Sequence, residues 1–530
     1  MKNKKISFNE TGLFSKLICD FVNSDLKLDF FNQSFFQLKD IKNHIKYSEK
    51  KDNTILLNVL KEQYKKTNFF NSKLSLIQSN INSLQNNNTY TVTTGHQLNI
   101  CSGPLFLIYK IISVLAYTHY LNKNIDTCHF VPCFWMATED HDFEEIKNIK
   151  LYGKDYNWNL STLDAVGNLP TDSISIFLDQ IRDVLSATEN GINLLDIYDF
   201  VYTKNINYAD ATRALLTSFF GNHGLVVVDG NHPKLKQLFV NDLKEEVCNQ
   251  FVYNTVLRNN NLIKTQYKPE INAMQANIFY LNNKKRKKII FDKGVFSTSD
   301  SIYKWSKNEL LSEIETYPER FSPNVLLRPL YQERVMNNLI YIGGPSELSY
   351  WLQLVIMFKE RKQVFPFLAL RSHFLILSKK TIKMQKKLGF QDFDLFIPYN
   401  KQLRKVINSR SPIKTKKYFQ VLNELLLDFE KKFHSIDGFP MNSFYVFQKR
   451  FNSEFKRLES KILRFEKTKN ANVLNQLKFI NENIFPNNIA QERVISFIPY
   501  YLKYGPHFFD LLIRESSIFG NKYTILKEDE

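Results

Sequence analysis

Residues 130–137 read FVPCFWMA, a continuous apolar run without a charged side chain. This composition is typical of a strand buried on both faces of a mostly parallel sheet. The residues that follow are Thr138 and then Glu139-Asp140-His141-Asp142. The sequence therefore predicts a buried strand whose carboxyl end carries an acidic cluster.

Similar short apolar segments recur along the chain and alternate with helical patterns. Gly103-Pro104 precedes an apolar helix predicted over 105–121, with proline in the favoured first position, and Gly343-Gly344-Pro345 repeats this arrangement. The other predicted strands are 90–94, 225–229, 339–342 and 367–371. Strands that alternate with helices predict an α/β doubly wound sheet, in which ligands bind beyond the carboxyl ends of the strands.

Length and composition indicate a large folded chain, with either one large core domain carrying insertions or two to three domains. The chain has 530 residues, of which 43% are hydrophobic and 14% aromatic, too apolar for a disordered chain. No apolar run is long enough to span a membrane, and the N-terminus is not a signal peptide. The five cysteines lack CxxC spacing, which indicates the reducing cytoplasm and no structural zinc site.

The formal net charge is +18, from 71 Lys and Arg against 53 Asp and Glu. Such a charge favours anionic partners, but a lysine-rich surface such as 284–288 is also typical of a solvated face. Charge alone does not identify the partner.

The pattern of the chain predicts a core interrupted by insertions and followed by a helical hairpin. Tyr418, Leu422, Leu425 and Phe429 follow helical spacing, as does a heptad seam of Phe451, Phe455, Leu458, Ile462 and Phe465. A turn is predicted at 437–440. The predicted segments are 1–151 (a helical N-terminal cap over 1–88 and the first part of the core), 152–205 (insertion), 206–261 (core), 262–322 (second insertion), 323–375 (core), 376–487 (antiparallel coiled coil) and 488–530 (a segment returning to the core).

Two features carry the chemistry of the predicted site. The loop from Gly95 to Pro104 has small residues and ends at a helix N-terminus, whose free amides attract phosphate or carboxylate; it could also be only a turn. The cluster at 139–142 suits general base work, cation binding or recognition of an ammonium group, although acidic residues also cap helices.

Arginines near predicted strand ends form a third feature. Arg328 and Arg371 can bind carboxylate or phosphate in bidentate fashion, or can form an internal ion pair with Glu347. Cys101 has no identifiable base beside it and is interpreted as a buried apolar residue.

Four motifs in order resemble one known family. They are Thr94-Gly95-His96-Gln97 with Ser102-Gly103-Pro104 and Tyr109-Lys110; 134–143, FWMATEDHDF; 322–329, SPNVLLRP, with Gln332-Glu333; and Gly343-Gly344-Pro345-Ser346-Glu347 with Tyr350-Trp351. Together with the hairpin and Gln491-Glu492-Arg493, this set is similar to the bacillithiol biosynthesis cysteine-adding enzyme family. His96 departs from the more usual glutamine.

The resemblance implies a Rossmann-like nucleotidyltransferase core, like that of class I aminoacyl-tRNA synthetases, with connecting-peptide insertions and a C-terminal coiled coil that forms a homodimer. It implies a cytoplasmic ligase that joins L-cysteine to glucosaminyl malate, with ATP and Mg²⁺ as candidate cofactors. HIGH and KMSKS motifs are not readable, which leaves ATP use open.

The resulting site prediction has three groups. The catalytic group is Glu139, Asp140, His141 and Asp142. The substrate-binding group is Gln97, Tyr109, Lys110, Arg328, Gln332, Glu347, Tyr350 and Arg371. The cofactor-binding group is Thr94, Gly95, His96, Ser102, Gly103 and Pro104, and no metal site is predicted.

Three other functions are compatible with the same residues. An RNA-binding protein would use the positive charge and the aromatic residues, but no compact RNA-binding motif is present, so nucleic acid is not the expected partner. A metal-dependent hydrolase would use Asp140, His141 and Asp142. A scaffold would act only through its hairpin.

Overall fold

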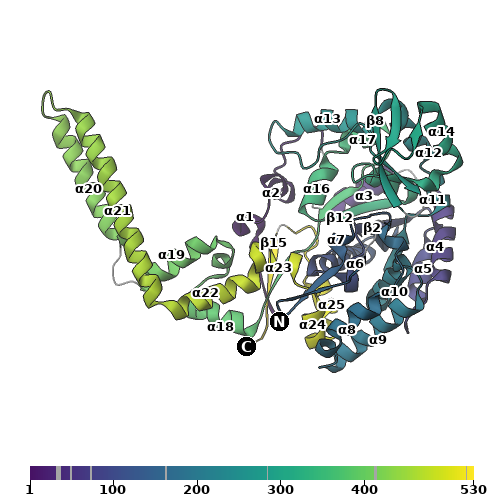
Figure 1. Ribbon diagram of the computed structural model, residues 1–530, viewed down its shortest axis with the longest axis horizontal. Coiled ribbons are helices and arrows are strands. Elements are labelled where there is room, and N and C mark those ends of the chain that lie inside the picture. The colour runs from purple at the N-terminus through teal and green to yellow at the C-terminus, as the bar shows by residue number, and fades with distance from the viewer. Residues whose placement is uncertain are drawn as a thin grey trace.

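The computed structural model describes residues 1–31, 38–47, 51–71, 74–160, 164–282, 285–410, 415–520 and 522–529. Its body is built on a five-stranded sheet of order β13-β12-β2-β3-β6 (Figure 1). Every pairing in this sheet is parallel. Its strands are β2 (Thr89–His96), β3 (His129–Met136), β6 (Val226–Asp229), β12 (Asn338–Gly343) and β13 (Phe367–Leu370).

This strand order confirms the predicted doubly wound core. In chain order the strands read 5-4-1-2-3, so the order reverses between β2 and β12. The apolar run at 130–137 forms β3, whose side chains alternate between two faces: Phe134 and Met136 belong to one core cluster, Cys133 and Trp135 to the other. Because both faces of this strand are buried, neither face carries polar side chains, which explains its unbroken apolar sequence.

Helices cover the sheet and its edges. The helix predicted over 105–121 is α6 (Leu105–Asn124), and Pro104 takes its N-cap position rather than the first helical position. The other helices of the core and its insertions are α7 (Phe143–Ile146), α8 (Ile174–Leu185), α9 (Glu189–Lys204), α10 (Tyr208–Phe220), α11 (Pro233–Gln237), α12 (Val240–Asn249), α13 (Phe251–Ile263), α14 (Lys307–Thr316), α15 (Arg328–Val335), α16 (Pro345–Leu352) and α17 (Val355–Glu360).

The predicted insertions are more regular than their polar sequences suggest. Within 152–205 the chain forms helices α8 and α9 and strand β5 (Lys154–Asn157), which pairs with β4 (Asn148–Leu151). Within 262–322 it forms a second five-stranded sheet of order β10-β9-β8-β7-β11, with antiparallel pairings throughout. Its strands are β7 (Ile278–Asn282), β8 (Lys285–Asp292), β9 (Val295–Thr298), β10 (Lys304–Trp305) and β11 (Phe321–Pro323).

The expectation of an entirely helical N-terminal cap is wrong at its start. Residues Lys2–Ser7 form strand β1, which pairs with β15 (Lys522–Lys527), and β15 in turn pairs with β14 (Phe374–Leu377). The partner strand lies at the other end of the chain, so no local pattern in this polar segment reveals the pairing. The helices that follow are α1 (Phe8–Thr11), α2 (Lys16–Val22), α3 (Leu38–Tyr47), α4 (Thr54–Lys66) and α5 (Ser75–Ser83).

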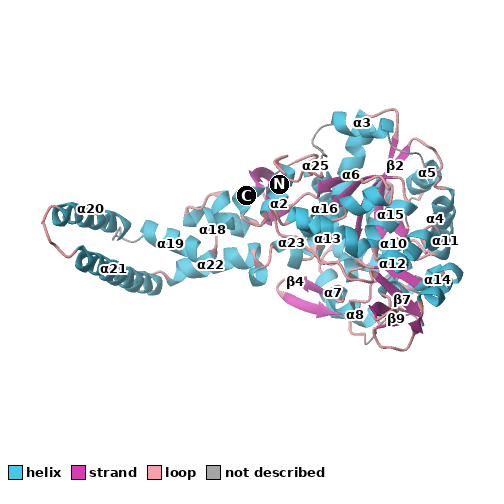
Figure 2. Cartoon of the chain, turned by 90° about the horizontal axis from the view of Figure 1, so that it is seen from above, coloured by secondary structure: helices cyan, strands magenta, loops and turns pink. Residues whose placement is uncertain are grey.

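The C-terminal part contains the predicted helical hairpin, which projects from the body (Figures 1 and 2). Helices α20 (Thr415–His434) and α21 (Met441–Lys469) form its two arms. The rings of Phe419 and Phe455 pack between the arms at 4.7 Å. The remaining helices are α18 (Lys379–Leu388), α19 (Tyr399–Arg410), α22 (Ala471–Ile484), α23 (Gln491–Val494), α24 (Ile498–Tyr504) and α25 (His507–Glu515).

The predicted seam is only partly buried within one chain. Leu425 is 52% exposed, Leu458 53% and Phe465 69%, whereas Leu426 and Phe444 are buried between the arms. The heptad pattern therefore describes an apolar surface that this single chain leaves open.

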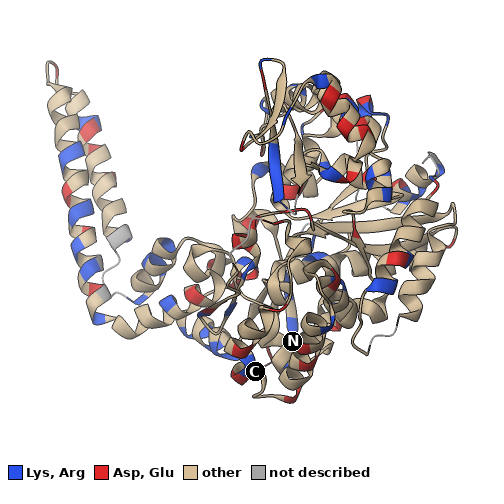
Figure 3. Cartoon of the chain, turned by 45° about the vertical axis from the view of Figure 1, so that its right-hand side comes forward, with Lys and Arg blue, Asp and Glu red and all other residues tan. Residues whose placement is uncertain are grey.

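The positive charge is concentrated in the same region. Residues 376–487 contain 23 Lys and Arg against 10 Asp and Glu, a difference of 13 out of the total of 18. Figure 3 shows the positions of the Lys and Arg residues in blue along the hairpin and its supporting helices. The excess charge thus belongs to the C-terminal part rather than to the core.

No helix among the described residues is both long and apolar enough to cross a membrane.

Candidate active site

A cavity of about 210 Å³ lies at the carboxyl ends of β2 and β3, beside the point where the strand order reverses. Ligands bind at this place in open α/β sheets. The lining comes from strand ends and the loops after them, from helices α15 and α16, and from strands β8 and β11 of the second sheet: Gly95, His96, Gln97, Trp135, Met136, Ala137, Thr138, Glu139, Asp140, Gly230, Asn231, Arg286, Pro323, Asn324, Val325, Arg328, Glu347 and Tyr350.

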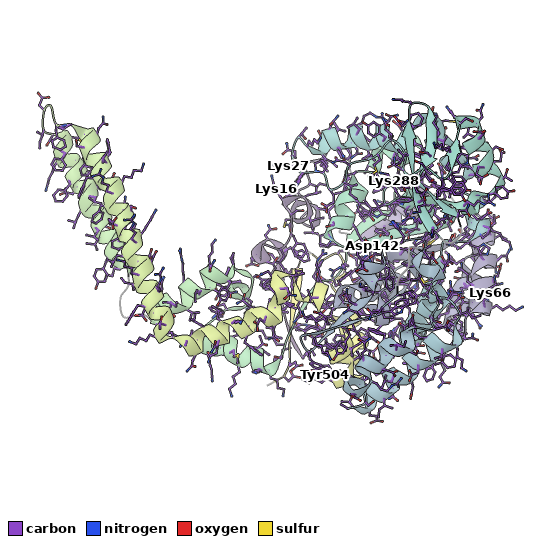
Figure 4. The ribbon with its side chains drawn as sticks, viewed as in Figure 1. Lys16, Lys27, Lys66, Asp142, Lys288 and Tyr504 are labelled. Atoms are coloured by element: carbon purple, nitrogen blue, oxygen red, sulfur yellow. The ribbon has the colours of Figure 1, made fainter. Side chains whose placement is uncertain are left out.

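Only half of the acidic cluster reaches this cavity. Glu139 and Asp140 line it, whereas His141 and Asp142 are exposed and do not. Figure 4 marks Asp142 on the body of the molecule, and Asp142 stands at the N-cap of α7 without a side-chain capping bond. The cluster is therefore divided between the cavity and the surface.

Asp140 uses both carboxylate oxygens within the protein. Oδ1 accepts hydrogen bonds from the amides of His141 at 2.7 Å and Asp142 at 3.3 Å, and Oδ2 accepts from Gln97 Nε2 at 2.7 Å. Gln97 follows β2 and Asp140 follows β3, so this bond joins the ends of two adjacent core strands. Asp140 fixes the shape of the loop.

Glu139 is held by a buried lysine. Oε1 of Glu139 accepts a hydrogen bond from Lys236, a fully buried residue of α11 that also donates to the carbonyl of Phe321 at 2.7 Å. Burial lowers the pKa of Lys236, and the carboxylate of Glu139 opposes that shift. Because a buried charge is retained only with a partner, Lys236 and Glu139 form one unit.

A second ion pair spans the strand reversal. Lys110 of α6 donates to Glu347 Oε1 at 2.7 Å and to the carbonyl of Gly95 at 2.8 Å. Glu347 Oε2 accepts from the amide of Gly344 at 2.7 Å. Burial lowers the pKa of Lys110, and Glu347 opposes this. The pair joins β2 to the start of α16, so Lys110 supports the cavity without lining it.

Arg328 is the cation of the cavity that lacks a carboxylate partner. It begins α15 and donates to Gln332 Oε1 at 3.0 Å and to the hydroxyl of Tyr350 at 3.4 Å. Among the described residues no carboxylate lies within 4 Å of its guanidinium. A Cβ added to Gly95 would make an ordinary van der Waals contact with Arg328 Nη1, at 3.5 Å, so the guanidinium lies close to the carboxyl end of β2.

Arg286 enters the cavity from strand β8 of the second insertion. It donates to Ser322 Oγ at 3.1 Å and to the carbonyl of Pro323 at 2.9 Å, and it lies 3.8 Å from Asp140. Its guanidinium stacks on the ring of Phe279 at 3.9 Å. The interpretation of 284–288 as a solvated basic face therefore fails for Arg286; Lys284 lies outside the described residues.

His96 lines the cavity as a neutral imidazole. Burial, followed by the nearby charge of Lys110, lowers the pKa of His96 well below its ordinary value. Its Nδ1 lies 3.5 Å from Lys110 Nζ. Histidine at this position therefore supplies a polar surface without charge.

Several predicted residues lie away from the cavity. Thr94, Ser102, Gly103 and Tyr109 are buried, and Pro104 is half-buried behind the loop. The amide of Leu105, at the start of α6, donates to the carbonyl of Ile495 at 2.9 Å and is therefore not free to bind a phosphate. The amide of Leu107 donates to the carbonyl of Pro104 at 3.1 Å, so two amides of this helix terminus are already engaged inside the protein.

Arg371 and Gln332 are also engaged inside the protein. Arg371 is buried and binds Glu492 at 2.6 and 3.1 Å, in place of the ion pair with Glu347 that the sequence allowed. Gln332 is buried and receives the hydrogen bond from Arg328. Gln332 therefore positions Arg328, while Arg371 connects β13 to the C-terminal segment.

Two important residues escaped the sequence analysis. Lys236 follows Pro233 on a short helix, and Arg286 lies in a run of lysines, so neither has a distinctive motif around it. The available signal for Lys236 was its position shortly after the predicted strand at 225–229, where the chain returns to the same sheet edge. Among the described residues, no group of three or more His, Cys, Asp or Glu side chains could hold a metal ion.

Comparison with known proteins identifies two matching family models. The N-terminal Rossmann-like domain of bacillithiol biosynthesis BshC matches residues 1–372, and the C-terminal coiled-coil domain of the same family matches residues 374–528. These matches confirm the predicted Rossmann-like core and the C-terminal coiled coil.

Relatives are similar over nearly the whole chain. Proteins named "Putative cysteine ligase BshC" from Flavobacterium psychrophilum and Flavobacterium johnsoniae are 33% and 34% identical, covering 98% of this chain and 99% of their own. One from Bacillus mycoides is 29% identical over 84% of this chain and 86% of its own. A solved structure titled as a "putative arginyl t-RNA synthetase" from Campylobacter jejuni aligns over 85% of this chain and 92% of its own at 10% identity, with a TM-score of 0.20, which carries no weight. The chain belongs to the BshC family of bacillithiol biosynthesis.

Proposed function

We propose that this protein is a ligase that joins the carboxyl group of L-cysteine to the amine of glucosaminyl malate, as the last step of bacillithiol biosynthesis. The relatives are named as cysteine ligases, and the new bond is an amide. The cavity at the carboxyl ends of β2 and β3 is the proposed site. Its polar groups come from both sides of the strand reversal, where two substrates can meet.

The charge pairing of the cavity is the observation that carries this proposal. Glu139 is paired with Lys236, Glu347 with Lys110, and Asp140 lies near Arg286. Arg328 has no carboxylate partner among the described residues, so its guanidinium is suited to bind an anionic group of a substrate. A guanidinium binds carboxylate or phosphate through two parallel hydrogen bonds. The malate carboxylates of the proposed substrate have this chemistry.

Amide formation from a free carboxylate in water needs an activated acyl group, and we propose ATP with Mg²⁺ as the source of activation. At the terminus of α6, which the sequence suggested as a phosphate cradle, the amides of Leu105 and Leu107 already donate to the carbonyls of Ile495 and Pro104. No step is therefore assigned to that loop. The five cysteines are free thiols, which supports a reducing cytoplasm as the compartment.

The reaction is tested by incubating purified protein with L-cysteine, glucosaminyl malate and Mg-ATP and following the products by mass spectrometry. We expect bacillithiol together with AMP or ADP, and no product without ATP. AMP would identify an adenylating ligase and ADP a phosphorylating one. Absence of product under all conditions would refute the proposed reaction.

We also propose that the hairpin pairs with the hairpin of a second copy. Leu425, Leu458 and Phe465 leave an apolar surface open on it.

Sedimentation of the full chain should show a dimer, and the double variant L458E/F465E should give a monomer. Because 376–487 is strongly basic, two hairpins repel each other, and salt should tighten the dimer by screening. A monomeric wild-type chain at all salt concentrations would contradict this.

A further inference from the structure

Within the acidic cluster, the side chains differ in the number of oxygens that remain available. Asp140 has both oxygens occupied by protein donors, and His141 and Asp142 do not line the cavity. Glu139 lines the cavity and uses Oε1 for Lys236. Among the described residues, no hydrogen-bond partner of Glu139 Oε2 is present. Of the two carboxylates of this cluster that line the cavity, Glu139 thus has one oxygen left for a ligand.

Lys236 fixes where that oxygen lies. Its ammonium bridges the Glu139 carboxylate and the Phe321 carbonyl, and it stands 5.2 Å from the centre of the Tyr331 ring. Phe321 belongs to β11 of the second insertion, while Lys236 belongs to α11 after β6. The lysine therefore ties Glu139 to two separate elements.

The residues that surround Glu139 are also held by close packing. The hydroxyl of Tyr331 donates to the carbonyl of Gly230 at 2.6 Å, and the Tyr331 ring packs against Trp135 at 5.6 Å. A Cβ on Gly230 would stand 2.2 Å from the Trp135 ring, so only glycine permits this contact. A substrate group bound at Glu139 Oε2 would therefore meet a fixed surface.

We infer that Glu139 binds the primary ammonium group of a substrate through Oε2, and that Lys236 is the positioning residue that holds Glu139 for this contact. The inference deepens the proposed function and rests on it. A carboxylate with one oxygen already bonded to a cation offers the other oxygen to a second cation in a fixed direction. Arg328, which lines the same cavity, offers the complementary site for a carboxylate.

Both proposed substrates carry an amine, so binding measurements with paired ligands decide which substrate supplies the ammonium group. The probes are L-cysteine, its deaminated analogue 3-mercaptopropionate, glucosaminyl malate and the N-acetyl derivative of glucosaminyl malate. Binding to the full chain is measured by isothermal titration calorimetry. The substrate that Glu139 recognises should bind more tightly than its amine-lacking or amine-blocked counterpart, and the other pair should not respond to changes at Glu139.

The variants are K236M, K236R, E139Q and the double variant K236M/E139Q. E139Q should weaken binding of one amine substrate by about tenfold, because the charge-assisted hydrogen bond to the ammonium is lost. K236M should weaken the same binding by a similar factor, about tenfold, because Glu139 is no longer held in the direction of the ligand. Affinity for the matching amine-free ligand should stay within about twofold. K236M should add no further loss in the E139Q background, since Lys236 acts through Glu139. K236R retains a cation and should lose less than K236M.

Lys234 provides the matched control on the same helix. It is exposed and lies 3.8 Å from Glu62, so K234M should leave all affinities unchanged. If K236M weakens amine-bearing and amine-free ligands equally, or weakens binding further in the E139Q background, the positioning role is refuted. If K236M does not fold, unchanged binding of both amines by E139Q refutes the inference. A wild-type chain that binds neither substrate overturns the proposed function, and the assignment of Glu139 with it.

Discussion

Replacing Arg328 with alanine is expected to lower kcat/KM for glucosaminyl malate by about 100-fold, the effect of losing a buried charge-assisted contact. The guanidinium lines the cavity and has hydrogen bonds to Gln332 and Tyr350 but no carboxylate partner within the described part of the chain. Steady-state kinetics with each substrate varied in turn measures the change. The loss should appear mainly in the KM of the substrate whose carboxylate Arg328 binds.

Two further variants separate charge from geometry at this position. R328K keeps the charge but loses the planar pair of donors, so an intermediate loss of about tenfold is expected. R258A removes an arginine that is exposed on α13 and paired with Glu360, and it should leave the kinetics unchanged. Equal activity of R328A and wild type in folded protein would show that the unpaired guanidinium has no role in binding substrate.

The parts of the fold that the sequence predicted are those with local causes. The β3 run is apolar because both faces of that strand are covered, and α6 follows a glycine-proline pair at its start. Glycine followed by proline before α16 gave the corresponding signal after β12. These patterns depend on residues that are close together in the sequence, and they predict the loops at the carboxyl ends of the strands.

The parts that sequence reasoning missed depend on contacts between distant segments. Strand β1 has a polar sequence and exists through pairing with β15, more than 500 residues away. Lys236 and Arg286 reach the cavity from α11 and β8, whose positions depend on how the core and the second insertion pack together. The sequence predicted that the acidic cluster directly follows a buried strand, and in the structure it follows β3. It could not show that both carboxylate oxygens of Asp140 accept hydrogen bonds within the protein, whereas Oε2 of Glu139 has no hydrogen-bond partner among the described residues.

The same limit applies to the two arginines, which look alike in sequence. Both follow apolar residues in the sequence, yet Arg328 lines the cavity and Arg371 is paired with Glu492 inside the protein. The difference arises because Glu492 comes from α23, after the hairpin, and reaches Arg371 only when the C-terminal segment folds back. These arginines should therefore respond differently to mutation.

Replacing Arg371 with methionine is expected to lower the free energy of unfolding by about 3 to 5 kcal/mol, because it leaves the Glu492 carboxylate buried and uncompensated. The carboxylate of Glu492 also lies 3.0 Å from Nδ1 of His373. The substitution therefore disrupts a cluster of three residues. The double variant R371M/E492Q removes both charges and should recover much of the stability. Chemical denaturation measures these differences, and KM values of folded R371M should stay close to those of wild type.

The pH dependence of unfolding provides an independent test of the same cluster. Burial alone would raise the pKa of Glu492, but Arg371 and His373 hold it well below the ordinary value of 4.5. A carboxyl group with a lowered pKa in the folded state stabilises the protein above its unfolded pKa, and this contribution is lost as pH falls toward the folded pKa. Wild-type stability should therefore fall below about pH 4.5, and R371M/E492Q should lack this part of the fall. If R371M changes substrate KM while leaving stability and its acid dependence intact, Arg371 acts on the substrate instead, because a purely structural ion pair cannot produce that result.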